Sequence, residues 1–257
     1  MFDATHILYM VISAIVTAGL LILAARLCKE PKQKDVVLKV AAVVTVIIHY
    51  SNLWVDYLTT GSATVENNHL FMIYPCNVMM WALVVVAFIP RKEGTAFTML
   101  ADFVFWVGIV CGSIGIILNT NYDNTPSLLD YDVLKGLLSH STMLFGCIYL
   151  VVGGYVKIRV FNVVSSFVGL LGFVTIGAIN NGLFSLFGLG SVNSMYLQEG
   201  PIESMPWITP WLMGAVGIAL LFIGLALYEM RLPKEERWYS KLRLKIDKVK
   251  QYLKREK

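Results

Sequence analysis

Three side chains that could carry nucleophilic or acid–base chemistry fall at similar positions in three long apolar stretches. They are His49 in the stretch at residues 36–58, Cys76 in the stretch at 69–89 and His140 in the stretch at 132–154. At 1.5 Å per helical residue, the three positions lie roughly 14, 10 and 12 Å from one membrane face. Reactive side chains inside a membrane are costly, so we interpret the three residues as a candidate site.

A cysteine within hydrogen-bond reach of an imidazole is a nucleophile with a base. Such a pair could hold an acyl group as a thioester and pass it to an acceptor hydroxyl. Asn77, or backbone N–H groups released by a helix kink at Pro75, could steady the oxyanion that forms. The alternative is structural, because a buried cysteine is commonly an apolar filler and an intramembrane histidine often bonds another helix.

Further polar residues accompany this group and could bind a substrate. Asn52 and Asp56 follow His49 by three and seven residues, which predicts the same helical face, and Asn180 closes the stretch at 160–180. Two histidines, Cys76 and Asp56 could also hold zinc, but their spacing matches no recognised metal motif. We therefore predict no metal and no cofactor.

The elements that must position these residues are seven apolar stretches. They span residues 6–27, 36–58, 69–89, 97–118, 132–154, 160–180 and 206–228, and each is long enough to cross about 30 Å of hydrocarbon as a helix. Of the 21 Lys and Arg residues, all but Lys135 lie at alternate gaps or in the tail. The positive-inside rule then predicts an exterior N-terminus and a cytoplasmic C-terminus.

Composition bounds the fold and the partners. A hydrophobic fraction of 57% predicts one all-α, seven-helix membrane bundle over residues 1–231, leaving no stretch for a soluble catalytic domain. Residues 232–257 form a basic tail with apolar side chains at steps of three or four, which predicts an amphipathic cytoplasmic helix. Such a helix suits the anionic lipids of the inner leaflet, or it is a solvated tail that enforces orientation. We expect no nucleic-acid binding, because the basic segment is short and tethered to a membrane.

Three features inside the bundle carry structural expectations. Gly108, Gly112 and Gly115 predict that the stretch at 97–118 is an interior helix that a neighbour approaches closely. Asp102 on the same stretch is expected to pair with Arg91, Arg159 or water. The exterior loop at 181–205 is expected to lie as a lid or to dip partway into the bundle.

Two segments carry a family resemblance. NHLFMIYPCNVMMW at residues 68–81 resembles the Leu-Pro-Leu-His-Leu-Cys segment of YwaF-like bacterial integral membrane proteins. GSVNSMYLQEGPIESMPWITPW at residues 190–211 is similar to their Gly-x-Asn-Tyr-Met-Tyr-Leu segment and the Gly-Pro-Trp-Pro-Trp that follows. This chain departs from the family pattern at three points. The family's histidine before the cysteine is Tyr74 here, its proline has moved to Pro75, and its second Pro-Trp pair is reduced to Pro210 and Trp211.

The resemblance implies a function. Animal relatives of that family are described as seven-span phospholipid acyltransferases that use a Cys and a His, which makes Cys76 the nucleophile and His140 the base. We therefore expect a lipid-directed acyltransferase or thioester-forming acyl hydrolase, multi-pass in the cell membrane, that acts on phospholipids or acyl lipids. The alternative is a non-enzymatic binding or transport protein whose outward-facing polar cavity is lined by His49, Asn52, Asp56 and Asn180.

Overall fold

A computed structural model describes residues 2–61, 74–119, 121–122, 126–188, 192–200, 207, 209–244 and 246. Within these residues the chain is all-helical and contains no strand, as the sequence predicts. The helices are α1 (Ala4–Leu27), α2 (Pro31–His49), α3 (Asn52–Thr60), α4 (Pro75–Phe88), α5 (Thr95–Ile117), α7 (Tyr131–Val152), α8 (Asn162–Leu186) and α9 (Pro210–Glu229), with short 3-10 helices η1 (Ser194–Tyr196) and η2 (Lys234–Glu236).

Six helical segments of the described chain are long and apolar enough to cross a membrane. They are α1, α5, α7, α8, α9 and the α2–α3 segment taken together as Pro31–Thr60. The remaining predicted stretch, at 69–89, contains α4, a shorter apolar helix of 14 residues. Residues 62–73 lie outside the described part of the chain, so the structure supports six candidate spans where the sequence predicts seven.

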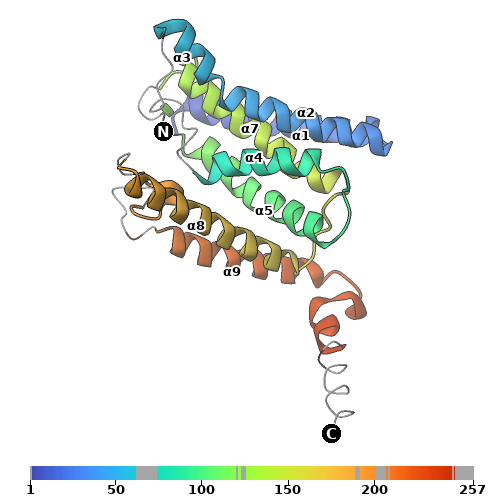
Figure 1. The fold of residues 1–257 in the computed structure, drawn as a ribbon. Coiled ribbons are helices and arrows are strands. Elements are labelled where there is room, and N and C mark those ends of the chain that lie inside the picture. The colour runs from blue at the N-terminus through green and yellow to red at the C-terminus, as the bar shows by residue number, and fades with distance from the viewer. Residues whose placement is uncertain are drawn as a thin grey trace.

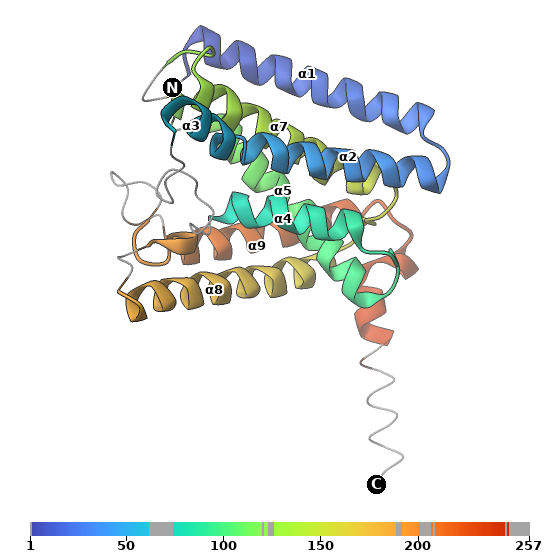
Figure 2. The ribbon, with the colours of Figure 1, turned by 45° about the horizontal axis from the view of Figure 1, so that its top comes forward.

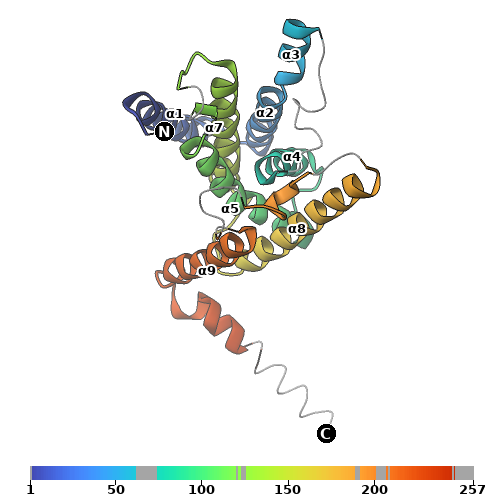
Figure 3. The ribbon, with the colours of Figure 1, turned by 90° about the vertical axis from the view of Figure 1, so that its left-hand side faces the viewer.

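The bundle is organised around α5 and α7 (Figures 1 and 2). α7 packs against α1 and α2, while α5 packs against α4 and α8, and α9 lies beside α8 (Figure 3). The two outermost helices, α1 and α9, expose most of their apolar side chains. Apolar surface on this scale requires a hydrocarbon environment rather than water.

Glycines on α5 let α7 approach closely, as the sequence predicts for this stretch. A Cβ atom on Gly108 would overlap the Cys147 side chain, and one on Gly112 would lie 3.2 Å from the Cβ of Leu144. Both glycines are buried, and Cys147 is fully buried. Small residues at a helix crossing bring the backbones together and increase van der Waals contact.

A hydroxyl cluster joins α1 to α7 within this apolar setting. The Ser13 and Ser141 hydroxyls lie 2.8 Å apart, and the Tyr9 hydroxyl lies 3.2 Å from Ser141. Ser141 in turn donates to the carbonyl of Leu137, one turn back on α7. Such bonds orient a helix that otherwise presents mainly apolar side chains to its surroundings.

One buried carboxylate fastens three segments at the opposite end of the bundle from α3. Glu229, at the end of α9, is 1% exposed. One of its oxygens accepts the backbone N–H of Val160 and the other accepts that of Trp238, both at 2.7 Å. Trp238 begins the tail helix and also packs edge-on against Phe222 of α9. Charge-assisted bonds of this kind are among the stronger hydrogen bonds in proteins, so Glu229 fixes the tail and the α7–α8 loop to α9.

The close crossing of α5 and α7 gives a test of the fold. Gly108→Leu should lower the free energy of unfolding by about 1–3 kcal/mol, because the new side chain must displace Cys147. Gly217→Leu on α9 is the matched control, because it makes the same chemical change where no atom lies within 4 Å. Thermal unfolding in detergent measures both, and equal unfolding temperatures for the two variants would contradict the packing described here.

Candidate functional site

Cys76 lies in the first turn of α4. Tyr74 is extended, with φ −92° and ψ 154°, and Pro75 takes the first helical position. Proline suits that position because it lacks an N–H that would have no partner there and because its φ is already helical. The predicted kink at Pro75 is therefore wrong: the proline starts the helix instead of bending it.

The position at a helix start shapes the chemistry of the Cys76 thiol. The thiol donates to the side-chain oxygen of Asn77 at 3.4 Å, and the backbone N–H groups of Cys76 and Asn77 lie within bonding range of the sulfur. These donors lie at the positive end of the helix dipole, beside the sulfur. The Cys76 thiol is free and half-buried. A second free thiol, that of Cys111 on α5, lies near it.

Aromatic side chains surround the sulfur. Tyr74 stacks on Tyr196 with ring centroids 5.1 Å apart. Burial raises the pKa of Tyr196, and the nearby Cys76 and Tyr74 raise it further. Tyr50, at the end of α2, lies near Cys76. Its hydroxyl accepts a 2.8 Å hydrogen bond from the indole N–H of Trp81. The Cys76 thiol therefore sits in an apolar and aromatic environment that reduces contact with water.

Tyr196 reaches this place because the loop after α8 folds into the bundle. Asn181 accepts the backbone N–H of Ser194 at 2.9 Å, and Asn180 donates to the Ser194 hydroxyl at 2.7 Å. Met195 is 4% exposed and packs on Gly177, where a Cβ would lie 2.8 Å from the methionine side chain. Of the two expectations for this loop, the described part dips inward. Asn180 lies six residues before the end of α8 rather than closing the helix.

Two adjacent residues in this loop hold an unusual backbone conformation. Met195 and Tyr196 both have φ of 56°, in the left-handed region that non-glycine residues rarely adopt. Each such residue costs on the order of 1–3 kcal/mol unless its surroundings enforce it. Here the Ser194 hydrogen bonds and the burial of Met195 hold the segment in place, so the loop is a specific structure over Cys76.

His140 lies on α7 and faces α5. Its Nδ1 atom is 2.7 Å from the carbonyl oxygen of Gly136, which only accepts, so Nδ1 carries the proton and Nε2 has the lone pair. The ring lies directly against Gly115 of α5, where a Cβ would overlap both Cδ2 and Nε2. The backbone thus fixes the tautomer in which Nε2 could accept a proton.

Helix registers show how Cys76 and His140 are related in height. α4 and α7 run in the same direction (Figure 1), and Leu83 of α4 meets Gly146 of α7. Seven residues back along each helix are Cys76 and Ser139, the residue before His140. By this contact Cys76 lies near the level of His140, whereas the approach of Met79 and Cys147 to Gly108 places Cys76 nearer Leu144, one helical turn away. Both helices pack against α5. No contact between the Cys76 and His140 side chains is found among the described residues.

The helix containing His49 differs from the prediction. α2 ends at His49 and α3 begins at Asn52, with a turn at Tyr50 and Ser51 between them. The prediction that His49, Asn52 and Asp56 share one helical face assumes an unbroken helix, and the turn interrupts that helix between His49 and Asn52. His49 packs edge-on against Tyr50 at 4.8 Å, Asn52 is buried and Asp56 is half-buried. Within the described residues, no group of three or more His, Cys, Asp or Glu side chains could hold a metal ion.

A second polar cluster, which the sequence analysis missed, lies at the same end of the bundle. His6 of α1 is fully buried, and its Nε2 lies 3.0 Å from the carbonyl of Ile116 on α5. Tyr122 stacks on the His6 ring at 4.7 Å and donates to both oxygens of Asp3, at 2.8 and 2.9 Å. Asp3 also caps α1 by accepting the N–H of His6. An acidic residue just before an apolar run is an N-cap signal that could have identified this helix start.

A membrane protein family matches most of the chain. The sequence model of the TMEM164 family, a membrane protein family, matches residues 1–228. No curated protein and no solved structure matches the chain.

The Asp3 cluster predicts a pH dependence of stability. The N–H of His6 and the hydroxyl of Tyr122 hold the pKa of Asp3 below its usual 3.8. The lowered folded pKa means that the stabilisation is complete above the unfolded pKa and is lost as the pH falls through the folded value. Asp3→Asn should therefore flatten the fall in unfolding temperature below about pH 4. Parallel curves for Asp3→Asn and the unmodified chain would show that Asp3 makes no such contribution.

Proposed function

The chain belongs to the TMEM164 family, and on that premise we propose that it is a lipid-directed acyltransferase, or a thioester-forming acyl hydrolase, of the cell membrane. One observation carries the proposal. A thiol at the start of α4 and an imidazole with its Nε2 lone pair toward α5 lie on two helices that both pack against α5. The resemblance of residues 68–81 to a cysteine-bearing segment of membrane acyltransferase relatives points to the same chemistry.

In the first half of the reaction, the Cys76 sulfur attacks the carbonyl carbon of an acyl ester. The thiol proton passes to Nε2 of His140, directly or through a water molecule, and a new S–C bond forms. The ester C–O bond then breaks, and the protonated imidazole returns the proton to the leaving alkoxide. The products are an acyl-Cys76 thioester and a deacylated lipid.

In the second half, an acceptor hydroxyl gives its proton to Nε2 of His140 and attacks the thioester carbonyl. The S–C bond breaks, and the imidazolium returns the proton to the Cys76 sulfur. With a lipid hydroxyl as acceptor the protein is a transferase, and with water it is a hydrolase. The carbonyl of Gly136, bonded to Nδ1, stabilises the imidazolium in both halves.

The first turn of α4 supports the developing oxyanion in this proposal. Backbone N–H groups at a helix start point along the positive end of the dipole, and those of Cys76 and Asn77 lie beside the sulfur. The aromatic environment of Tyr74 and Tyr196 limits water access, which protects a thioester from hydrolysis and favours transfer over hydrolysis.

We further propose that the outer polar residues contact the lipid substrate. His49, Asn52 and Asp56 flank the break between α2 and α3, where a headgroup could reach the polar side chains from the exterior face. Asn180 acts through the loop, because it bonds Ser194 two residues before Tyr196. Phospholipids or other acyl lipids are therefore the proposed partners at this end of the bundle.

At the opposite end, we propose that the basic tail binds anionic lipids of the inner leaflet. The described part of the tail helix starts at Trp238, and Leu242 and Leu244 are 41% and 59% exposed. Apolar side chains among lysines and arginines suit the interface of an anionic membrane.

A non-enzymatic binding protein is the second candidate. Asn52 of α3 is buried and Asp56 is half-buried, so this segment could recognise a polar ligand without any acyl turnover. Stabilisation by a lipid in the absence of a Cys76 thioester would favour this function.

Covalent labelling tests the acyl-transfer proposal. A thiol-directed, lipid-like acyl probe should form a thioester on Cys76, and Cys76→Ala should abolish it. His140→Ala should slow labelling on the order of 100-fold through the loss of the base. Cys111→Ala is the matched control, because it removes the neighbouring thiol and should leave labelling intact. Equal labelling of the full chain and Cys76→Ala, located by mass spectrometry, would exclude Cys76 as nucleophile.

The contact between Gly115 and His140 gives a positioning test. Gly115→Ala puts a methyl group where the His140 ring lies, so the base must move, and labelling of Cys76 should slow on the order of 100-fold. Gly172→Ala on α8 makes the same change in open space and should have no effect. The pH dependence of labelling should change in Gly115→Ala alone, and unchanged rates in a folded Gly115→Ala protein would rule out this role for His140.

A further inference from the structure

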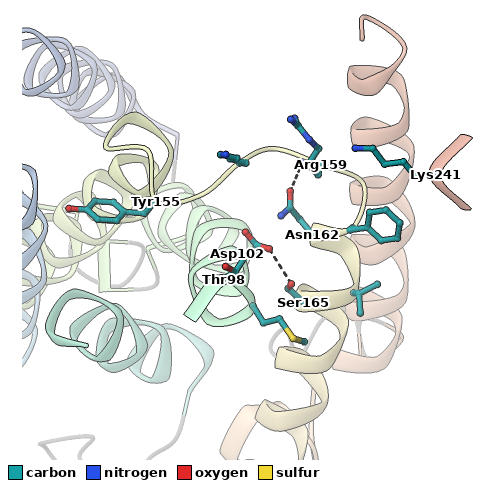
Figure 4. Close-up of a pocket in the computed structure, with 11 residues that line it drawn as sticks. Thr98, Asp102, Tyr155, Arg159, Asn162, Ser165 and Lys241 are labelled. Carbon is teal, nitrogen blue, oxygen red and sulfur yellow. Dashed lines mark hydrogen bonds between the residues drawn. The ribbon is translucent and has the colours of Figure 1, made fainter. Parts of the chain in front are cut away.

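A cavity of about 550 Å³ lies at the end of the bundle opposite Cys76, on the side that the Lys and Arg distribution predicts to be cytoplasmic. Side chains from four segments line it (Figure 4): Asp102 from α5, Lys157 and Arg159 from the α7–α8 loop, Asn162 and Ser165 from the start of α8, and Lys241 from the tail helix. Its volume lies in the range of small-molecule sites. None of these residues has a role in the proposed acyl transfer.

The cavity carries an excess of positive charge. Lys157, Arg159 and Lys241 all line it, and within the described residues none of them has a carboxylate within ion-pair distance. The Arg159 guanidinium donates to the carbonyl of Ile158 at 2.8 Å, a neutral acceptor that leaves its charge uncompensated. Three cations from separate segments, gathered around one cavity, are suited to a phosphate group.

The floor of the cavity holds a carboxylate whose hydrogen bonds are incomplete. Asp102 is 4% exposed, and one oxygen accepts the Ser165 hydroxyl at 3.2 Å, as Figure 4 shows. The other oxygen is buried and has no hydrogen bond of good geometry within the described residues, although the Asn162 side chain lies close to the carboxylate. The expected pairing of Asp102 with Arg91 or Arg159 is not among the ion pairs of the described chain. A buried acceptor without a donor is costly, so a ligand that supplies the donor gains affinity.

The surface beside the cavity is apolar. Phe161 and Val164 line it and are 45% and 53% exposed. Both belong to the start of α8, which lies at the membrane boundary of a candidate span. A ligand with acyl chains could lay them against these side chains while its polar end occupies the cavity.

We propose that this cavity binds the headgroup of an inner-leaflet phospholipid that carries a hydrogen-bond donor, such as ethanolamine or glycerol. Lys157, Arg159 and Lys241 surround the phosphate, and the ammonium or hydroxyl of the headgroup donates to the Asp102 oxygen that does not bond Ser165. Inorganic phosphate would pair with the cations but would be repelled by the Asp102 carboxylate. A choline headgroup has no N–H or O–H group that could donate a hydrogen bond to that carboxylate. The site is independent of the acyl-transfer chemistry at Cys76.

Glu229 holds the parts of this site together. Its carboxylate bonds the backbone of Val160, next to Arg159, and that of Trp238, three residues before Lys241. The cations of the loop and of the tail are thus brought to one cavity by a bond that lies outside it. This placement gives a reason for a buried carboxylate at the end of α9.

Lipid binding to the full chain in detergent, measured by native mass spectrometry, tests the proposal. Short-chain phosphatidylethanolamine and phosphatidylglycerol should bind at least about tenfold more tightly than phosphatidylcholine, which lacks the donor. Lys157→Gln with Arg159→Gln should weaken binding roughly 25-fold, at about fivefold for each basic side chain. The matched control is Lys32→Gln with Lys34→Gln, two basic residues at the same end of the bundle but outside the cavity, and it should leave affinity unchanged.

Two further measurements separate the alternatives. Asp102→Asn should erase the preference for ethanolamine over choline and strengthen binding of inorganic phosphate, a pattern that simple destabilisation would not produce. Glycerophosphoethanolamine, which has the headgroup without acyl chains, should bind at least tenfold more weakly than the lipid. If the double variant does not fold, Lys241→Gln alone should still weaken binding about fivefold. Equal affinities for ethanolamine and choline lipids, equal affinities for the lipid and its soluble headgroup, or unchanged binding in the folded variants would each overturn the proposal.

Discussion

The close crossing of α5 and α7 is the contact on which the rest of the bundle depends. It exists because Gly108, Gly112 and Gly115 present bare backbone to α7. The same crossing presses His140 against α5 and fixes its height, while the other faces of α5 receive α4 and α8. A single glycine-lined helix face therefore determines both the packing of the centre and the place of the imidazole.

Much of this arrangement is encoded locally and could be predicted. Apolar length predicts the spans, and the spacing of Gly108 and Gly112 predicts an interior helix, because both follow from the period of a helix and the thickness of a bilayer. Counting residues from the ends of the stretches also predicts a common depth for Cys76 and His140. This stays a prediction, because the contacts of Leu83 with Gly146 and of Met79 and Cys147 with Gly108 give registers that differ by about one helical turn.

The features that could not be predicted depend on where helices start and stop and on contacts between distant segments. A proline in an apolar run can bend a helix or begin one, and only the extended backbone of Tyr74 decides in favour of a start at Pro75. The break after His49 has no glycine or proline to mark it. The bonds of Ser194 to Asn180 and Asn181, and that of His6 to Ile116, join residues whose pairing no sequence spacing reveals.

The carboxylate of Glu229 has a consequence for how the sequence can vary. Its two partners at positions 160 and 238 are main-chain donors, so those bonds survive any replacement there except proline, which has no N–H. Position 229 has no comparable freedom. Aspartate is one methylene shorter, and glutamine would turn an NH₂ group toward a donor. These two hydrogen bonds therefore restrict the side chain at position 229, whereas at its two partner positions they require only a backbone N–H.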